Sequence, residues 1–112
     1  MYKLVIQIET ATDGPAFDEA WPQFLHLAES MPALRREATC RVETVLYGEY
    51  PVTLIHELYF DTLEEAHKAM ASPQGRAAGK LLQEVTQGRM TLFFADHKQD
   101  DIENIQKFRT TE

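Results

Sequence analysis

The sequence has 112 residues, a length typical of one domain with a single hydrophobic core. Eleven Lys and Arg residues against eighteen Asp and Glu residues give a formal net charge of -7, and no segment carries a basic run that could neutralise a row of phosphates, so we expect no nucleic-acid partner. The single cysteine, Cys40, allows neither an internal disulfide nor a multi-cysteine zinc site, and no stretch approaches the ~20 apolar residues of a membrane span, so we expect a cytoplasmic protein.

The first half of the chain predicts a strand, a helix and a second strand. Residues 3–9 alternate apolar and polar side chains with the period of a strand. Residues 15–28 carry apolar side chains at helical spacing behind an Asp-Gly-Pro start, and Pro22 within them predicts a kink or a restart. A second strand is predicted over residues 38–47, where apolar and polar side chains alternate again.

The second half of the chain predicts two more strands with helices between them. Residues 53–60 alternate as a strand does, and Thr62 and Ser72 are each in a sequence context typical of a helix N-cap. Residues 90–97 form the last predicted strand. The apolar spacing after Asp100 predicts a short helix in the tail.

The order β-α-β-β-α-β is that of the α+β ferredoxin-like fold, and we interpret residues 1–112 as one domain with a core at 2–97 and a tail at 98–112. Such a sheet has helices on one face only. If Leu4 and Leu58 face the helices, the other face is too apolar for free water and too polar for a dry core. This face would carry Val5, Gln7, Ile55, Glu57 and Tyr59. We therefore expect a homodimer in which two sheets face each other around a cavity.

Several segments, taken in order along the chain, resemble the EthD family, named for ethyl tert-butyl ether degradation. They are residues 15–21 (PAFDEAW), 26–28 (HLA), 31–36 (MPALRR), 58–66 (LYFDTLEEA), 71–78 (ASPQGRAA) and 92–96 (LFFAD). The resemblance implies a dimeric α/β barrel formed by two ferredoxin-like protomers. It also implies a small protein associated with degradative oxidation or polyketide-type cyclisation, and it matches His26 to a histidine of the family's first helix, although Leu27 replaces the proline that follows there.

The candidate catalytic residues are His26, Glu57 and Tyr59. The sequence has no Gly-rich phosphate loop, zinc-ligand spacing or nucleophile elbow, so we expect cofactor-free acid-base chemistry without a metal. Glu57 and Tyr59 share one face of their strand and could bind or protonate a substrate oxygen. The alternatives are a packed structural role for His26 and a salt-bridged dimer seam for Glu57.

The candidate ligand-binding residues are Gln7, Trp21, Arg41, Tyr47 and Phe93. For Trp21 and Phe93 the alternative of a core aromatic is the favoured one, because aromatic residues dominate small cores. Arg41 and Tyr47 share a face of the second predicted strand, where they could contribute to the cavity or to the dimer seam. His56 points opposite to Glu57 and is expected to be a hydrogen-bonded core histidine beneath a helix.

These residues predict an EthD-like protein that binds a small, partly apolar metabolite, either as a cofactor-free acid-base enzyme or as an accessory factor in degradative oxidation. One alternative is a non-catalytic binding or interaction module. Another is a cofactor-free monooxygenase of an aromatic substrate, which would share the fold. A ligand-sized pocket with converging polar groups favours ligand binding, whereas a solid sheet interface favours the interaction module.

Overall fold

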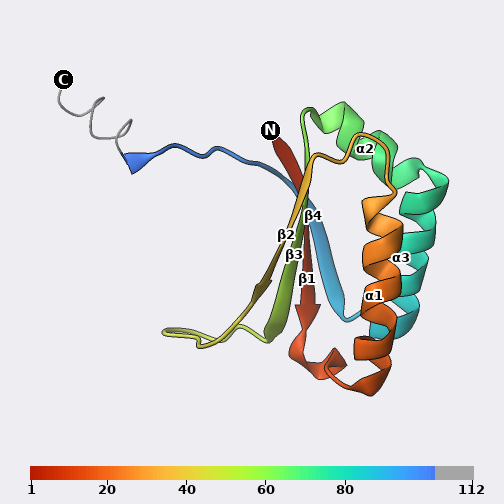
Figure 1. Cartoon of the computed structure of the whole chain (residues 1–112). Helices are drawn as coiled ribbons and strands as arrows, with labels where there is room; N and C mark the ends of the chain where they lie inside the picture. Colours follow the sequence, from red (N-terminus) through yellow and green to blue (C-terminus); the bar gives the residue numbers. More distant parts are fainter. Residues whose placement is uncertain (103–112) are drawn as a thin grey trace.

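A computed structural model describes residues 1–102 of the chain. Its elements are β1 (Tyr2–Glu9), a 3₁₀ turn η1 (Thr10–Thr12), α1 (Pro15–Glu29), β2 (Arg36–Arg41), β3 (Val52–Phe60), α2 (Leu63–Ala71), α3 (Pro73–Thr86) and β4 (Met90–Asp96). The strands form one antiparallel sheet in the order β2-β3-β1-β4, and the helices cover one of its faces (Figure 1). This is the predicted ferredoxin-like α+β arrangement. None of the helices in this part of the chain combines the length and apolarity that a membrane span requires.

The face of the sheet that packs against the helices carries the alternate residues of β1 and β3. Leu4 is paired with Leu58, and Ile8 with Leu54, so these side chains point to the same side. They are buried together with residues of the three helices, among them Phe17, Phe24, Ala28, Ala66, Ala69, Ala78 and Leu82. Burial of one such large aliphatic or aromatic side chain contributes about 1.5–3 kcal/mol, which fixes which face of each strand is inside.

The other face, called here the open face, carries the intervening residues. Val5 is paired with Glu57 on one side and with Phe93 on the other, and Gln7 is paired with Ile55. No helix of residues 1–102 covers this side of the sheet in Figure 1. The predicted mixture of apolar and charged side chains on an uncovered face is therefore confirmed.

The helix boundaries follow the predicted capping residues. The Thr62 hydroxyl accepts a hydrogen bond from the Glu65 amide at 3.1 Å, and the Ser72 hydroxyl accepts one from the Gly75 amide at 3.1 Å. Each bond satisfies an amide that has no partner within its helix. The predicted restart of α1 at Pro22 is wrong, since α1 is unbroken from Pro15 to Glu29. Pro22 is exposed, so the helix carbonyl that it leaves without an N–H partner can be solvated.

The second strand is shorter than predicted. β2 ends at Arg41, and its last bond to β3 runs from the Val42 amide to the Thr53 carbonyl at 3.0 Å. Residues 43–51, called here the β2–β3 arm, leave the sheet on the side away from the helices (Figure 1). β3 begins only at Val52, so the arm has no strand of its own sheet to pair with, and the prediction of a strand to residue 47 is wrong. The helix predicted after Asp100 lies almost wholly outside the described residues.

The close packing of Gly75 against the end of α2 can be tested by adding a single methyl group. A Cβ atom at this buried position would lie 2.7 Å from the Met70 carbonyl oxygen and closer still to that of Ala69. Gly75→Ala is therefore expected to destabilise the fold by about 1–3 kcal/mol in urea denaturation. Gly79→Ala is the matched control, because a Cβ there meets no atom within 4 Å, and it should stabilise α3 by about 0.5–1 kcal/mol. Equal stability of the two variants would contradict the close approach at Gly75.

Candidate functional site

A cluster of charged and aromatic side chains lies on the open face, around Tyr59. Lys3 of β1 and Arg36 of β2 are both paired with Tyr59 of β3, so the register places two cations on either side of one phenol ring. The Arg36 guanidinium carbon lies 4.1 Å from the centre of the Tyr59 ring, and the Lys3 ammonium lies 5.7 Å from it. Both distances are within the range of cation–π attraction.

Glu57 is the anion of this cluster. It forms an ion pair with Lys3 and accepts a hydrogen bond from the Tyr59 hydroxyl at 3.1 Å. Burial alone would raise the pKa of Glu57, but the hydrogen bonds from Lys3 and Tyr59 and the charges of Lys3 and His97 outweigh it, so this pKa is lowered. Glu57 is therefore an ionised acceptor at neutral pH and has no proton to give to a substrate oxygen.

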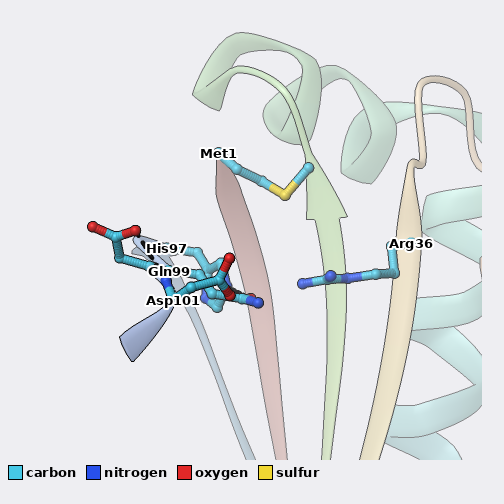
Figure 2. A pocket seen from close by; sticks show the side chains of 6 residues that line it. Met1, Arg36, His97, Gln99 and Asp101 are labelled. Carbon is cyan, nitrogen blue, oxygen red and sulfur yellow. Dashed lines mark hydrogen bonds between the residues drawn. The ribbon is translucent and has the colours of Figure 1, made fainter. Parts of the chain in front are cut away.

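A cavity of about 480 Å³, open to solvent on one side, lies beside the cluster, and its volume is within the usual range of ligand pockets. Its lining residues are Met1, Arg36, His97, Gln99, Asp100 and Asp101 (Figure 2). The His97 amide donates to the Met1 carbonyl at 2.8 Å, which holds the start of the segment after β4 against β1. The His97 ring meets the Tyr59 ring edge-on at 4.9 Å. Tyr59 is only 4% exposed, so the cavity wall here consists of Arg36 and His97 rather than of Tyr59 itself.

Four of the predicted site residues lie together on the open face. They are Gln7, Glu57, Tyr59 and Phe93. Phe93 is 42% exposed, an unusual fraction for a large aromatic residue in the middle of a strand. Strand parity placed Gln7, Glu57 and Tyr59 on this face from the sequence, whereas Phe93 is placed by its pairing with Val5. None of the four lines the 480 Å³ cavity directly.

The other four predicted residues do not join them. Trp21 and His26 are on α1, which covers the opposite face, and His26 is exposed there, so within the protomer His26 lies away from Glu57 and Tyr59. Arg41 is paired with Leu54 and thus lies on the helix side of the sheet. Tyr47 is on the β2–β3 arm and is 98% exposed. Arg41 and Tyr47 do not share a strand face, because β2 ends between them.

A second polar cluster lies on the helix side, around His56. The His56 Nδ1 atom lies 2.7 Å from the Thr39 hydroxyl, and its Nε2 atom lies 3.1 Å from a Glu37 carboxyl oxygen. Its ring meets the Trp21 ring edge-on at 5.3 Å. The predicted hydrogen-bonded core histidine is therefore confirmed, and burial lowers the pKa of His56 to about 4.

The pKa of Glu37 is shifted in the opposite direction to that of His56. Burial and a hydrogen bond with the Glu29 carboxyl raise the pKa of Glu37 to about 7, because two neighbouring carboxyl groups resist ionising together. Between these two pKa values both His56 and Glu37 are neutral. Their contact is then a neutral hydrogen bond rather than an ion pair.

Neither cluster is a metal centre by its donor set. Within residues 1–102, no group of three or more His, Cys, Asp or Glu side chains is arranged to hold a metal ion. The polar side chains that line the cavity and contact Tyr59 and His56 are hydrogen-bonding groups that act as acids, bases, donors or acceptors. What the open-face cluster can do chemically is bind polar groups of a ligand and orient them.

Known proteins of similar sequence and structure place this chain among EthD-like folds. The chain matches no family model. A solved structure of an ethyl tert-butyl ether degradation (EthD) family protein from Bacillus halodurans is 29% identical, covers 88% of this chain and 99% of its own, and superposes with a TM-score of 0.79. The resemblance to the EthD family is confirmed.

Three further proteins extend the comparison of this EthD-like chain. An uncharacterised 11.0 kDa protein of the thcB-thcC intergenic region of Rhodococcus erythropolis is 27% identical over 99 residues, which are 88% of this chain and 96% of the relative. SnoaB, a cofactor-independent oxygenase from Streptomyces nogalater, has a TM-score of 0.65 at 11% identity, covering 88% of this chain and 94% of its own. A dimeric protein of unknown function from Bacteroides fragilis has a TM-score of 0.62 at 16% identity, covering 86% and 95%. The last two share the fold alone.

Sequence reasoning missed Arg36, Glu37, Thr39 and His97. The first three lie on β2, and the predicted strand began after two of them. Extending β2 by two residues would have placed Glu37 and Thr39 on one face, opposite His56. His97 was counted as the last residue of the final strand, and nothing local in its sequence connects it with Tyr59.

The raised pKa of Glu37 predicts a pH-dependent stability difference. A carboxyl whose pKa is raised by folding stabilises the fold below its ordinary pKa, and this contribution is lost as the pH rises through the folded value. The free energy of unfolding of Glu37→Gln should therefore rise relative to that of the wild type between pH 5 and pH 7.5, by about 1 kcal/mol after allowance for solvent screening. Urea denaturation at both pH values measures the difference, in which the titration of His56 largely cancels.

Glu57→Gln is the control for this experiment. The pKa of Glu57 is lowered, so its titration is complete below this pH range and its difference from the wild type should stay constant. If the stability difference between Glu37→Gln and the wild type were equally constant, the raised pKa of Glu37 would be contradicted.

Proposed function

We propose that this chain forms a homodimer in which the open faces of two sheets face each other, and that each protomer binds a small, partly apolar, oxygenated metabolite in the cavity beside Arg36 and His97. The observation that carries the proposal is the position of this cavity. It lies on the face that also leaves apolar side chains uncovered, so one contact between protomers would bury those side chains and enclose the ligand.

Exposed apolar side chains support the dimer. Leu46 is 94% exposed and Tyr47 is 98% exposed, both on the β2–β3 arm, and Phe93 is 42% exposed on the open face. The arm leaves the sheet on the open-face side in Figure 1, as does the segment after β4. Apolar groups gathered on one side of a small protein are typical of an interaction surface. The Bacteroides fragilis protein of the same fold is described as dimeric, which adds support.

The charge arrangement supports ligand binding at this place. Glu57 is held ionised mainly by Lys3 and accepts a hydrogen bond from the Tyr59 hydroxyl, so these three residues hold the Tyr59 ring in place. Arg36 and His97 rest on that ring and supply hydrogen-bonding groups to the cavity. Glu57 and Tyr59 are then positioning residues beneath the binding surface.

The alternative functions differ in what they require. A non-catalytic module that only contacts another protein would use the open face as a solid interface, whereas the 480 Å³ cavity with its polar lining favours a small ligand. A cofactor-free monooxygenase shares the fold, as SnoaB does at 11% identity, but a fold hosts many reactions. We therefore propose ligand binding, with or without turnover, as the function common to an enzyme and an accessory factor.

Ile55→Asp tests the dimer. Ile55 is a partly buried residue in the middle of the open face, and an unpaired carboxylate there would be desolvated on association at a cost of several kcal/mol. The variant is expected to sediment as a folded monomer at micromolar concentration, where the wild type sediments as a dimer. Leu63→Asp is the control, since Leu63 is an exposed residue of the helical layer, and it should remain dimeric. A monomeric wild type would remove this part of the proposal.

Glu57→Gln and Tyr59→Phe test the positioning of the cavity wall. Each keeps most of the side-chain volume. Tyr59→Phe removes the donor of the Tyr59–Glu57 hydrogen bond, and Glu57→Gln removes the charge that strengthens this bond and that pairs with Lys3. Both variants should stay dimeric and bind 4-hydroxybenzamide several-fold more weakly, as followed by NMR shifts of the Arg36 and His97 amides. His26→Gln should bind as the wild type does, because His26 lies in the opposite layer. The reverse pattern would place the site on the helix side.

A further inference from the structure

Arg36 differs from the neighbouring cations in forming no ion pair with a carboxylate of residues 1–102. Arg35 is bound to Asp61, with its Nε atom 2.8 Å and a terminal nitrogen 2.7 Å from the same carboxyl oxygen. Lys3 is paired with Glu57. None of the ion pairs formed among residues 1–102 includes Arg36, although it lines the cavity. The cavity therefore contains a guanidinium that forms no ion pair within residues 1–102, with Asp100 and Asp101 elsewhere in the same lining.

The Tyr59 ring holds this guanidinium without using its hydrogen-bond donors. The contact of 4.1 Å is with the face of the ring, so the N–H groups at the edge of the planar fork stay available. Figure 2 shows the Arg36 side chain extending across β3 towards the other lining residues. A planar fork fixed in this way matches the two oxygens of a carboxylate in geometry and in charge.

The opposite side of the cavity has the contrary chemistry. His97, Gln99 and Asp101 lie there in Figure 2, and Asp100 completes the lining. Carboxylate and amide oxygens accept hydrogen bonds from the hydroxyl groups of a ligand, and the carboxylates repel a ligand carboxylate. The net charge of the chain, -7, also disfavours anions in general, so any preference for an acid must arise locally at Arg36.

We infer that the ligand of this cavity is a small hydroxylated carboxylic acid, with its carboxylate on the Arg36 guanidinium and its hydroxyl group directed to Gln99 and Asp101 on the opposite wall. This inference rests on the proposed function, because it assigns a substrate class to the same cavity. It makes Arg36 the residue that determines specificity.

Paired probes that differ only in charge test the inference. Binding of 4-hydroxybenzoate and of its neutral amide, 4-hydroxybenzamide, is measured by NMR titration of the full-length protein at one pH and low salt. The wild type should bind the acid about ten-fold more tightly than the amide, as a charge-assisted, two-pronged hydrogen bond requires. Arg36→Met should reduce this ratio to about one, and Arg36→Lys, which keeps the charge but not the fork, should retain about three-fold.

Arg41→Met is the matched control, since it removes the same charge from the same strand on the helix side of the sheet, and it should keep the full ratio. If the wild type bound the amide as tightly as the acid, or more tightly, the substrate class would be overturned while the proposed function would stand. Binding of neither probe at millimolar concentration would overturn both. Dissociation of the dimer by Arg36→Met in sedimentation would also overturn the inference, because Arg36 would then pair with a carboxylate of the second protomer.

Discussion

The alternation of side chains along β3 is the constraint on which the two clusters depend. His56 points to the helices, and Glu57 and Tyr59 point away from them, so adjacent residues lie in different environments. Leu54, Leu58 and Phe60 fix the parity, because moving the strand by one residue would expose all three and bury Glu57. The hydrophobic core thus determines which polar groups each face of the sheet receives.

The two faces then treat charge in opposite ways. On the helix side, burial makes the neutral forms of His56 and Glu37 the favoured ones, and their hydrogen bond ties the edge strand to the centre of the sheet. On the open face, Lys3 keeps Glu57 ionised, and the ring of Tyr59 supports Arg36. Only the open-face cluster retains a cation that faces a cavity, which is why we assign ligand binding to it rather than to the more deeply buried histidine.

The sequence predicted the fold well where local pattern and tertiary pairing agree. The alternation of β1 and β3 and the caps at Thr62 and Ser72 each have a local cause, and all are in the structure. Prediction failed for the β2 region, whose apolar alternation continues to residue 47 although its partner strand begins only at Val52. The start of a strand in an antiparallel pair depends on where the other strand ends, and this is not encoded in either segment alone.

The dependence of strand pairing on distant segments also explains how much of the site could be predicted. Parity placed Glu57 and Tyr59 correctly, but Arg36 and His97 meet Tyr59 only through the register of β2 and the path of the chain after β4. The alternation in residues 43–47 has no use within the chain's own sheet, where Leu46 and Tyr47 have no cover. An amphipathic segment that its own sheet leaves unpaired is what a contact with a second protomer would require. The error in predicting β2 as a longer strand therefore adds support to the homodimer that we proposed from the open face.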